Sequence, residues 1–309
     1  MSADRKPVSV VIPTRNGRDT LERALQSLLP NAGYIHEVLL VFSNSDANYR
    51  EWCGRLLARY GRFFHASSLD SGAASNSAVA RNCGIQAAAG PYLAFLDDDD
   101  EWMPHKLDEY LRTVAQRRLS GDFVLFSTVV SCLEDRSDWL LFPQLSYHDQ
   151  AIADFVLSPY GGVQTSSILL PTALARRVRF DARLIRHTDY DFCIRLGEAG
   201  ASFHAIAEPL SYWYRRGSNV SKGATFDYCT DWLAANRHRI SRAAFIGYLE
   251  KDLLATARAT GRWGDYLRFR RLHLNARERR ASWQRLAARA LRKLAHPVGA
   301  GRRGKYQPA

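Results

Sequence analysis

Long apolar runs, paired cysteines and a secretory leader are all missing from this sequence. Its 309 residues contain no uninterrupted stretch of about 18 apolar residues, so we expect no membrane-spanning helix. The five cysteines are scattered and include no C-x-x-C pair, which argues against a zinc site or a disulfide framework and favours a reducing compartment. Residues 1–6 are polar and lead straight into a strand-like run, so no signal peptide is expected. These features favour a cytoplasmic protein.

The first hundred residues alternate between strand-like and helix-like segments. Residues 8–12, 38–42 and 92–96 are short apolar runs typical of buried strands, and residues 63–64 are a weaker candidate. Helical spacing of apolar residues separates these runs, as in 78–89, which end at a Gly-Pro pair. This order predicts a mostly parallel sheet covered by helices on both faces, with ligands beyond the carboxyl ends of its strands.

The second half of the chain is more mixed. Residues 122–131, 163–170 and 210–214 are expected to be strands, and residues 189–199 a helix. From residue 225 onward the pattern is almost entirely helical.

Four consecutive carboxylates, Asp97 to Asp100, follow the apolar run 92–96. Such close like charges repel, and a divalent cation relieves the repulsion. Hard ions such as Mg²⁺ or Mn²⁺ take oxygen ligands, and Mg²⁺ commonly binds one or two carboxylates together with substrate phosphates. The alternative is a solvated acidic turn before a helix that begins near residues 103–104, where Asp is also favoured. The cluster therefore predicts either a metal–diphosphate site or an acidic helix start.

Four segments, taken in order, resemble motifs of the family-2 glycosyltransferases. They are VSVVIPTRN at 8–16, ARNCGI at 80–85, LDDDDEWMPHKL at 96–107 and TDYDFCIRL at 188–196. The resemblance spans roughly residues 7–221. It implies the α/β GT-A fold of nucleotide-diphospho-sugar transferases, with a mostly parallel central sheet covered by helices and a C-terminal helical extension.

The resemblance also implies a domain division. Residues 1–224 would form the catalytic domain, of which 1–100 bind the nucleotide sugar and 101–224 form the acceptor side. Residues 225–298 would be a basic helical extension, and 299–309 a disordered tail.

For the donor site, the resemblance implies that Asp97, Asp98 and Asp99 are the D-x-D metal motif. Asp99 would ligate Mg²⁺ or Mn²⁺ directly, and Asp98 would lie near the ribose and phosphates of the donor. Arg81 would approach the nucleobase or the diphosphate, the alternative being a surface helix charge. The residues expected around the nucleotide are Pro13, Thr14, Asn16, Ser43, Arg81, Asp97 and Asp98.

The same resemblance implies that Asp189 is the general base. A carboxylate that takes the proton of an acceptor hydroxyl speeds attack by about 10²–10⁴-fold, and a metal across the diphosphate stabilises the leaving group. One base and one metal on opposite sides of the anomeric carbon give a single displacement with inversion. Asp191 competes for this role, although residues two apart on a helix do not share a face. His187 is a further candidate.

Three departures from the family pattern concern specificity. Phe42 and Ser43 stand where acidic residues usually follow the second strand, so Ser43, Asp46 and Asp70 are the remaining candidates for a nucleobase contact. Thr188 stands where Glu usually precedes the base. The Q-x-x-R-W motif of processive synthases is absent, which argues against processive synthesis.

Positive charge is concentrated near the C-terminus. The whole chain has a net charge of +12, and residues 262–305 contain 14 Lys or Arg against two acids. This segment includes a basic amphipathic helix. It either adsorbs to anionic lipid headgroups, on the inner face of the cell membrane, or packs on the catalytic domain with its arginines in water. Nucleic-acid binding is not expected, because no recognition module is present. The apolar stripe of this helix comprises Trp283, Leu286, Ala287, Ala290, Leu291 and Leu294, and Arg285, Arg289, Arg292 and Lys293 lie off it.

These implications together describe an inverting transferase. It would move a sugar from a nucleotide diphosphate sugar, with UDP-sugar expected, to a glycan or lipid-linked acceptor in surface polysaccharide or lipopolysaccharide synthesis. The alternative is a non-catalytic nucleotide- or glycan-binding protein on the same fold, which Phe42, Ser43 and Thr188 suggest. A dinucleotide-dependent dehydrogenase is disfavoured, because no G-x-G-x-x-G follows the first strand.

Overall fold

A computed structural model of the chain describes residues 6–72, 76–215, 225–295 and 306, with side chains in the last helix described as far as residue 291. The chain forms two compact units. Unit 1 comprises Met1–Val130 and Val163–Tyr214, and unit 2 comprises Ser131–Gly162 and Arg215–Ala309.

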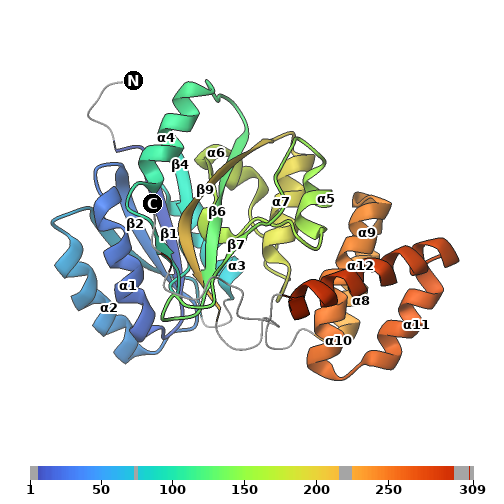
Figure 1. Cartoon of the computed structure of the whole chain (residues 1–309). Helices are drawn as coiled ribbons and strands as arrows, with labels where there is room; N and C mark the ends of the chain where they lie inside the picture. The colour runs from blue at the N-terminus through green and yellow to red at the C-terminus, as the bar shows by residue number, and fades with distance from the viewer. Residues whose placement is uncertain (1–5, 73–75, 216–224, 296–305, 307–309) are drawn as a thin grey trace. The chain divides into compact units, whose positions relative to one another are not determined.

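A central sheet forms the core of unit 1 (Figure 1). Its strands follow the order β3-β2-β1-β4-β8-β6-β9-β5. The β1–β2, β2–β3 and β1–β4 pairs are parallel, and the β4–β8, β6–β8 and β5–β9 pairs are antiparallel. The expected α/β fold is confirmed, and its parallel part is the half predicted from the alternating pattern. The strands are β1 Val8–Thr14, β2 Ile35–Phe42, β3 His65–Asp70, β4 Tyr92–Phe95, β5 Glu101–Trp102, β6 Phe123–Cys132, β8 Leu169–Pro171 and β9 Ser202–Tyr214.

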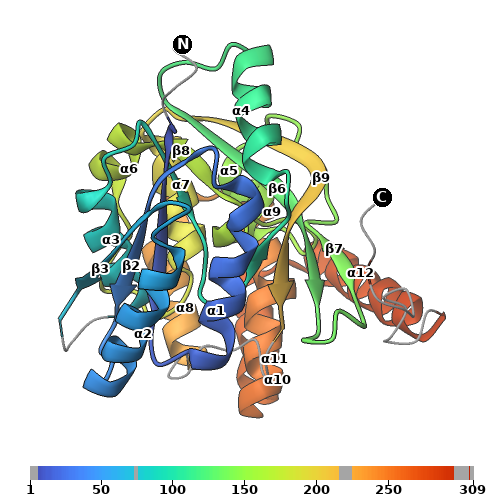
Figure 2. The same ribbon diagram turned by 90° about the vertical axis from the view of Figure 1, so that its left-hand side faces the viewer.

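Helices cover the parallel strands because successive strand side chains point to opposite faces. Val8, Val10 and Ile12 of β1 belong to one apolar cluster with residues of α1 and α2, and Figure 2 shows these helices in front of the strands. Val11, on the other face, packs against α3. The helices of unit 1 are α1 Arg18–Ser27, α2 Ala47–Tyr60, α3 Ser77–Ala87, α4 Lys106–Gln116, α6 Thr172–Val178 and α7 Thr188–Glu198, with the 3-10 turns η1 Leu29–Asn31 and η2 Thr165–Ser167.

Gly84 allows α3 to lie close to β1. A Cβ atom added to Gly84 would come within 2.4 Å of Val11 Cγ1. We therefore expect Gly84→Ala to lower the free energy of unfolding by about 1–3 kcal/mol through overpacking. Gly54 on α2 has open space around it, so Gly54→Ala should instead stabilise the protein by up to about 1 kcal/mol. Chemical denaturation of both variants measures the two changes in the free energy of unfolding. Equal changes would contradict the claim that Gly84 is needed for the close packing of α3 on β1.

Two strand predictions are wrong. The third strand is His65–Asp70 and not residues 63–64, because β3 is an edge strand with small polar side chains and lacks an apolar signal. Residues 163–170 are buried throughout, yet only Leu169–Pro171 form a strand and Thr165–Ser167 form a 3-10 turn. The composition of this buried segment resembles that of a strand, although most of its backbone is not extended in the sheet.

Unit 2 is mainly helical, which confirms the helical C-terminal extension. The contacts also assign residues 131–162 to this unit, whereas the sequence analysis expected them in the acceptor side of the catalytic domain. Within the described part of the chain, no helix has the length and apolar character needed to cross a membrane. The expected disordered tail lies outside the described residues except for Tyr306. The elements are β7 Leu140–Phe142, α5 Ile152–Leu157, α8 Phe226–Ala235, η3 Arg237–Arg239, α9 Arg242–Tyr248, a π-helical turn η4 Leu249–Leu253, α10 Leu254–Thr260, α11 Trp263–His273 and α12 Ala276–Ala295.

Candidate active site

The loops that follow β1 and β2 are joined by hydrogen bonds. The backbone N–H of Ser43 donates to the carbonyl of Thr14 at 2.9 Å, and the Asn16 side chain accepts from the N–H of Asp46 at 3.2 Å. Asn16 has a positive φ of 56°, which Asn tolerates better than most residues. Pro13 lies beside Val41 in the β1–β2 ladder. The structure therefore brings Pro13, Thr14, Asn16 and Ser43 together at one edge of the sheet.

Asp98 connects the acidic segment to the loop after β1. Its Oδ2 accepts from Thr14 Oγ1 at 2.5 Å and from the N–H of Arg15 at 3.4 Å. Burial raises the pKa of Asp98 to about 6, and the Thr14 hydrogen bond opposes this rise only in part. A Cβ atom at Gly17 would lie 2.7 Å from Asp98 Oδ2, so glycine there leaves room for the carboxylate.

Arg81 reaches the acidic segment from α3. Its Nη2 lies 2.5 Å from Asp97 Oδ1, and only 7% of the Arg81 side chain is exposed against 24% for Asp97. The Arg81 guanidinium also lies 5.3 Å from the ring centroid of Phe180. Arg81 is therefore a buried partner of Asp97 and not a surface helix charge.

Asp100 points away from the other acids and into the protein. It is 1% exposed, and its Oδ2 accepts from Ser166 Oγ and Gln164 Nε2, each at 2.6 Å. Burial raises its pKa well above the usual range of a carboxyl group. The acids therefore do not share one environment, because Asp97, Asp98 and Asp100 have different side-chain partners.

Among the residues that the structure describes, no group of three or more Asp, Glu, His or Cys could by itself hold a metal ion. Asp97 pairs with Arg81 and Asp98 binds Thr14, and Asp97, Asp98 and Asp99 are all partly exposed. Mg²⁺ sites commonly use one or two carboxylates and complete their shell with water and substrate phosphates. The donor set therefore fits a metal that one or two of these carboxylates hold together with a diphosphate, and does not fit a cage made by the described residues alone.

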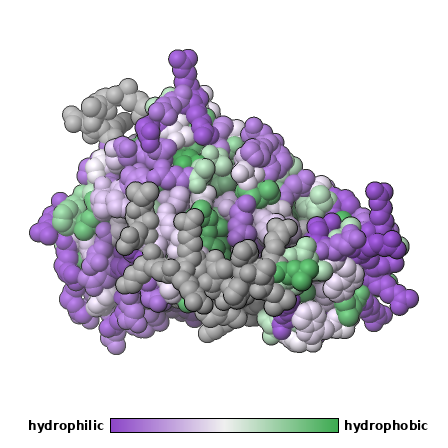
Figure 3. Space-filling model, in the orientation of Figure 1, coloured by the Kyte–Doolittle hydropathy of each residue, from purple (hydrophilic) through white to green (hydrophobic). Residues whose placement is uncertain are grey.

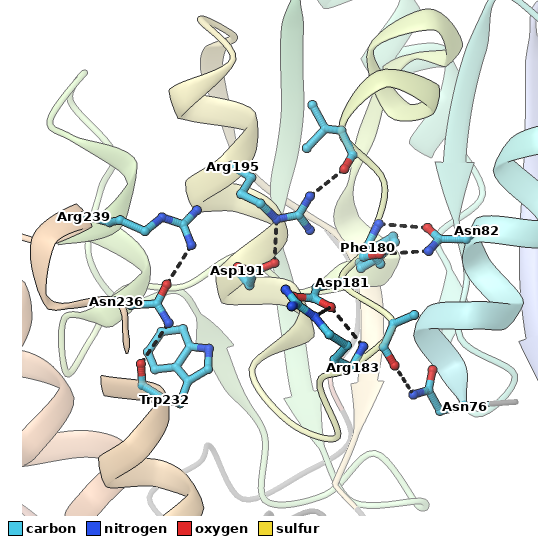
Figure 4. Close-up of polar contacts among 12 residues, drawn as sticks. Asn76, Asn82, Phe180, Asp181, Arg183, Asp191, Arg195, Trp232, Asn236 and Arg239 are labelled. Atoms are coloured by element: carbon cyan, nitrogen blue, oxygen red, sulfur yellow. Dashed lines mark hydrogen bonds and ion pairs between the residues drawn. The ribbon is translucent and has the colours of Figure 1, made fainter. Parts of the chain in front are cut away.

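The helix α7 carries the candidate base in its first turn. Asp189 is partly exposed, and its Oδ1 accepts from the N–H of Tyr190 at 3.0 Å. Asp191 is 4% exposed, and its Oδ2 lies 2.7 Å from Arg195 Nε in an ion pair (Figure 4). His187 is buried, has a φ of 62° and stacks on Tyr190 at 5.4 Å. Asp191 and His187 thus have packing roles.

Other candidates for the nucleobase contact are also engaged. Asp46 caps α2 by accepting from the N–H of Tyr49 at 2.7 Å. Asp70 accepts from the N–H of Gly72 and pairs with Arg50, and both interactions lower its pKa.

Ser166 and Gln164 were not among the predicted site residues. Ser166 Oγ accepts from the N–H of Asp97 at 3.0 Å while it donates to Asp100. It therefore ties both ends of the acidic segment to the turn η2. Both residues lie in the segment that composition alone marked as a strand.

These features define an α/β protein with an acidic segment at the carboxyl end of its parallel strands. The sequence profile of "Glycosyl transferase family 2" matches residues 9–153. The amylovoran biosynthesis glycosyltransferase AmsB of Erwinia amylovora is 33% identical over 245 residues, which cover 78% of this chain and 81% of AmsB. The chain therefore belongs to glycosyltransferase family 2 and is a glycosyltransferase.

Other similar proteins agree with this assignment. TuaG of Bacillus subtilis, provisionally named for teichuronic acid biosynthesis, is 27% identical over 177 residues, covering 55% of this chain and 68% of TuaG. S. aureus TarS 1–349, solved with UDP-GlcNAc, has a TM-score of 0.57 at 14% identity and covers 91% of this chain and 79% of its own. The mannosyltransferase PcManGT of Pyrobaculum calidifontis, solved with GDP-Man and Mn²⁺, has a TM-score of 0.58 at 15% identity. The match covers 94% of this chain and 81% of PcManGT. The two structures support the fold.

Proposed function

We propose that this glycosyltransferase is an inverting, metal-dependent enzyme that uses Asp189 as its general base. One observation carries the proposal, namely that α3 contacts both halves of the candidate site. Arg81 of α3 pairs with Asp97, and the next residue, Asn82, forms two hydrogen bonds with the backbone of Phe180 in the loop before α7. One element, α3, thereby contacts both the acidic segment and the loop that leads to the helix of Asp189.

The reaction follows from these groups. The acceptor hydroxyl gives its proton to the Asp189 carboxylate as its oxygen attacks the anomeric carbon of the donor sugar. The bond from this carbon to the diphosphate oxygen breaks, and its electron pair leaves with the nucleoside diphosphate. A single displacement from the face opposite the leaving group inverts the anomeric configuration.

Three acidic residues would serve the donor differently. Asp99 would hold Mg²⁺ or Mn²⁺, and a metal bound there supplies positive charge against the departing diphosphate. Asp97 is paired with Arg81, which lowers the negative charge that the segment presents to phosphates. Asp98 holds the loop after β1 through Thr14, near the position proposed for the ribose.

The acceptor and pathway are proposals from similarity. AmsB is named for amylovoran and TuaG for teichuronic acid biosynthesis, which supports a role in surface polysaccharide or lipopolysaccharide synthesis with a glycan or lipid-linked acceptor. TarS was solved with UDP-GlcNAc, which supports a UDP-sugar donor. PcManGT was solved with GDP-Man and Mn²⁺, so GDP-sugars belong in the same test.

A donor panel tests the proposed function. The purified protein is incubated with UDP-, GDP- and dTDP-sugars, with Mn²⁺, Mg²⁺ or chelator, and release of nucleoside diphosphate is measured. We expect metal-dependent release from one donor class, and NMR recorded before mutarotation should show the inverted configuration in the sugar released. Tight donor binding without turnover would favour the non-catalytic binding protein, and retained configuration would reject the single displacement.

A second candidate function, binding to a membrane surface, is favoured by the orientation of α12 in unit 2. Arg285 pairs with the buried Glu250 at 2.6 Å, and Arg289 Nη1 donates to the Glu250 carbonyl at 3.4 Å. Trp283 and Leu291 on the apolar stripe are 50% and 64% exposed. The helix thus contacts Glu250 through two of its arginines, while two large apolar side chains of its stripe remain at least half exposed.

The surface around α12 is suited to anionic lipid. Figure 3 shows mostly hydrophilic side chains with apolar patches between them at its right-hand side, where α11 and α12 lie in Figure 1. Apolar side chains among cationic ones match a headgroup region into which the apolar groups insert. We therefore propose that unit 2 holds the enzyme at an anionic membrane, on its cytoplasmic side.

Exchange of the exposed apolar pair tests the membrane proposal. We expect the double variant Trp283→Ser, Leu291→Ser to bind phosphatidylglycerol vesicles about 10-fold more weakly, because each side chain loses apolar burial. Leu133→Ser, which alters a leucine of unit 2 that is 42% exposed, is the matched control and should bind like the wild type. Sedimentation with vesicles gives the affinities, and unchanged binding by the double variant would refute the proposal.

A further inference from the structure

The loop that precedes α7 is held at its start by two asparagines of α3 and its cap. Asn82 Oδ1 accepts from the N–H of Phe180 at 2.8 Å, and Asn82 Nδ2 donates to the Phe180 carbonyl at 2.8 Å. Asn76 Nδ2 donates to the carbonyl of Ala182 at 2.9 Å. Figure 4 shows both asparagines facing this loop from α3. Seven residues further along from Ala182 stands Asp189.

The side-chain amide of Asn82 satisfies both backbone groups of Phe180. A primary amide carries a donor and an acceptor side by side, whereas a carboxylate can only accept and an alkyl group can do neither. The two bonds repeat the pairing that a neighbouring strand would give, in a place where no strand pairs with this segment in the described sheet. The clamp thus depends on the identity of residue 82.

Phe180 links α3 to α7, because its backbone bonds to Asn82 of α3 and its ring packs on Phe192 of α7. Its ring is 3% exposed and stacks on Phe192 of α7, with centroids 4.0 Å apart and planes 20° apart. It also meets Phe95 of β4 edge to face at 5.3 Å, and the Arg81 guanidinium lies over it. Phe95 is two residues before Asp97. One aromatic side chain therefore contacts the base-bearing helix, the strand that leads to the acidic segment, and the arginine that pairs with Asp97.

We propose that Asn82 is a positioning residue for the transfer reaction, acting through the Phe180 backbone to fix the start of α7, and hence Asp189, relative to the acidic segment. The inference rests on the proposed function, in which Asp189 is the base. Asn82 does not touch the reacting atoms. Its effect arises because a proton acceptor displaced by about 1 Å can cost about 100-fold in rate.

The first test separates positioning from general stability. We expect Asn82→Ala to lower kcat for transfer by about 10- to 100-fold, with KM for the donor within about twofold of the wild type. Asn82→Asp keeps the bond from the Phe180 N–H but sets a carboxylate against the Phe180 carbonyl. It should therefore lose kcat as well, and it serves as the second variant if the alanine protein folds poorly.

Asn31 offers a matched control in the same unit. Its side chain forms the same kind of clamp elsewhere, donating to the Met103 carbonyl at 3.1 Å and accepting from the Leu107 N–H at 2.9 Å. Asn31→Ala loses the same two kinds of bond and should lower Tm by a similar amount with kcat nearly unchanged. If Asn31→Ala lowers kcat as much as Asn82→Ala does, general loosening explains both and the positioning role is overturned.

A double variant shows whether Asn82 acts through the base. In an Asp189→Asn background, Asn82→Ala should lower the residual single-turnover rate no further, because no base remains to be positioned. An equal fall in both backgrounds would overturn the proposal. If Asp189→Asn is inactive while Asn82→Ala is fully active, only the positioning role fails. If Asp189→Asn is fully active, the proposed base is wrong and the positioning role fails with it.

Discussion

Asp189→Asn is expected to lower the rate of sugar transfer by about 10²–10⁴-fold, the usual contribution of a general base. The substitution keeps the shape of the side chain and removes its ability to take a proton. Donor affinity should stay the same, because the acidic segment and the loops after β1 and β2 bind the donor in our proposal. Initial rates give kcat, and calorimetric titration with donor and metal gives the affinity.

Asp191→Asn is the matched control for this prediction. Asp191 is buried and paired with Arg195, which also donates to the carbonyl of Val178. Removing one charge of a buried pair is strongly destabilising, so this variant should lose thermal stability, whereas Asp189→Asn should melt like the wild type. A larger loss of kcat in folded Asp191→Asn than in Asp189→Asn would indicate that Asp191, and not Asp189, is the general base.

Asp99→Asn is expected to remove most of the response of transfer to Mn²⁺ or Mg²⁺ and to lower the rate at saturating donor by at least about 100-fold. Even residues that only support metal ligands cost 10- to 100-fold in metal affinity or activity, and a direct ligand should cost more. Rates measured across a metal titration, with chelator as the zero point, give both the apparent metal affinity and the maximal rate.

Asp100→Asn makes the same chemical change one residue further along. Because the Asp100 carboxylate binds Ser166 and Gln164 inside the protein, its replacement should alter Tm while the apparent metal affinity stays within about threefold of the wild type. If Asp100→Asn loses the metal response and Asp99→Asn keeps it, the ligand assignment is wrong.

The part of the fold that the sequence predicted well is the part governed by local pattern. β1, β2 and β4 are apolar runs because they are buried, and they were found where the structure has them. β3 was displaced because an edge strand with exposed small side chains carries no apolar signal. The assignment of residues 131–162 to the helical unit depends on contacts between distant segments, which no local pattern encodes.

The candidate site was predictable at the level of motifs and not of partners. The motifs placed Thr14, Arg81 and Asp98 in one site, and the structure brings them to the same edge of the sheet. Among the four adjacent acids, Asp97, Asp98 and Asp100 each bind a different neighbour. Those neighbours lie up to 114 residues away in sequence, as with the Tyr214 N–H and Asp100, and spacing cannot reveal them.

A crystal structure of the enzyme with its nucleoside diphosphate sugar and Mn²⁺ tests the central claim most directly. We expect the metal to join Asp99 to the diphosphate, with the Asp189 carboxylate on the opposite side of the anomeric carbon and within reach of an acceptor hydroxyl. A donor bound away from residues 97–99, or an Asp189 carboxylate that faces out of the cleft holding the sugar, would contradict the proposed reaction.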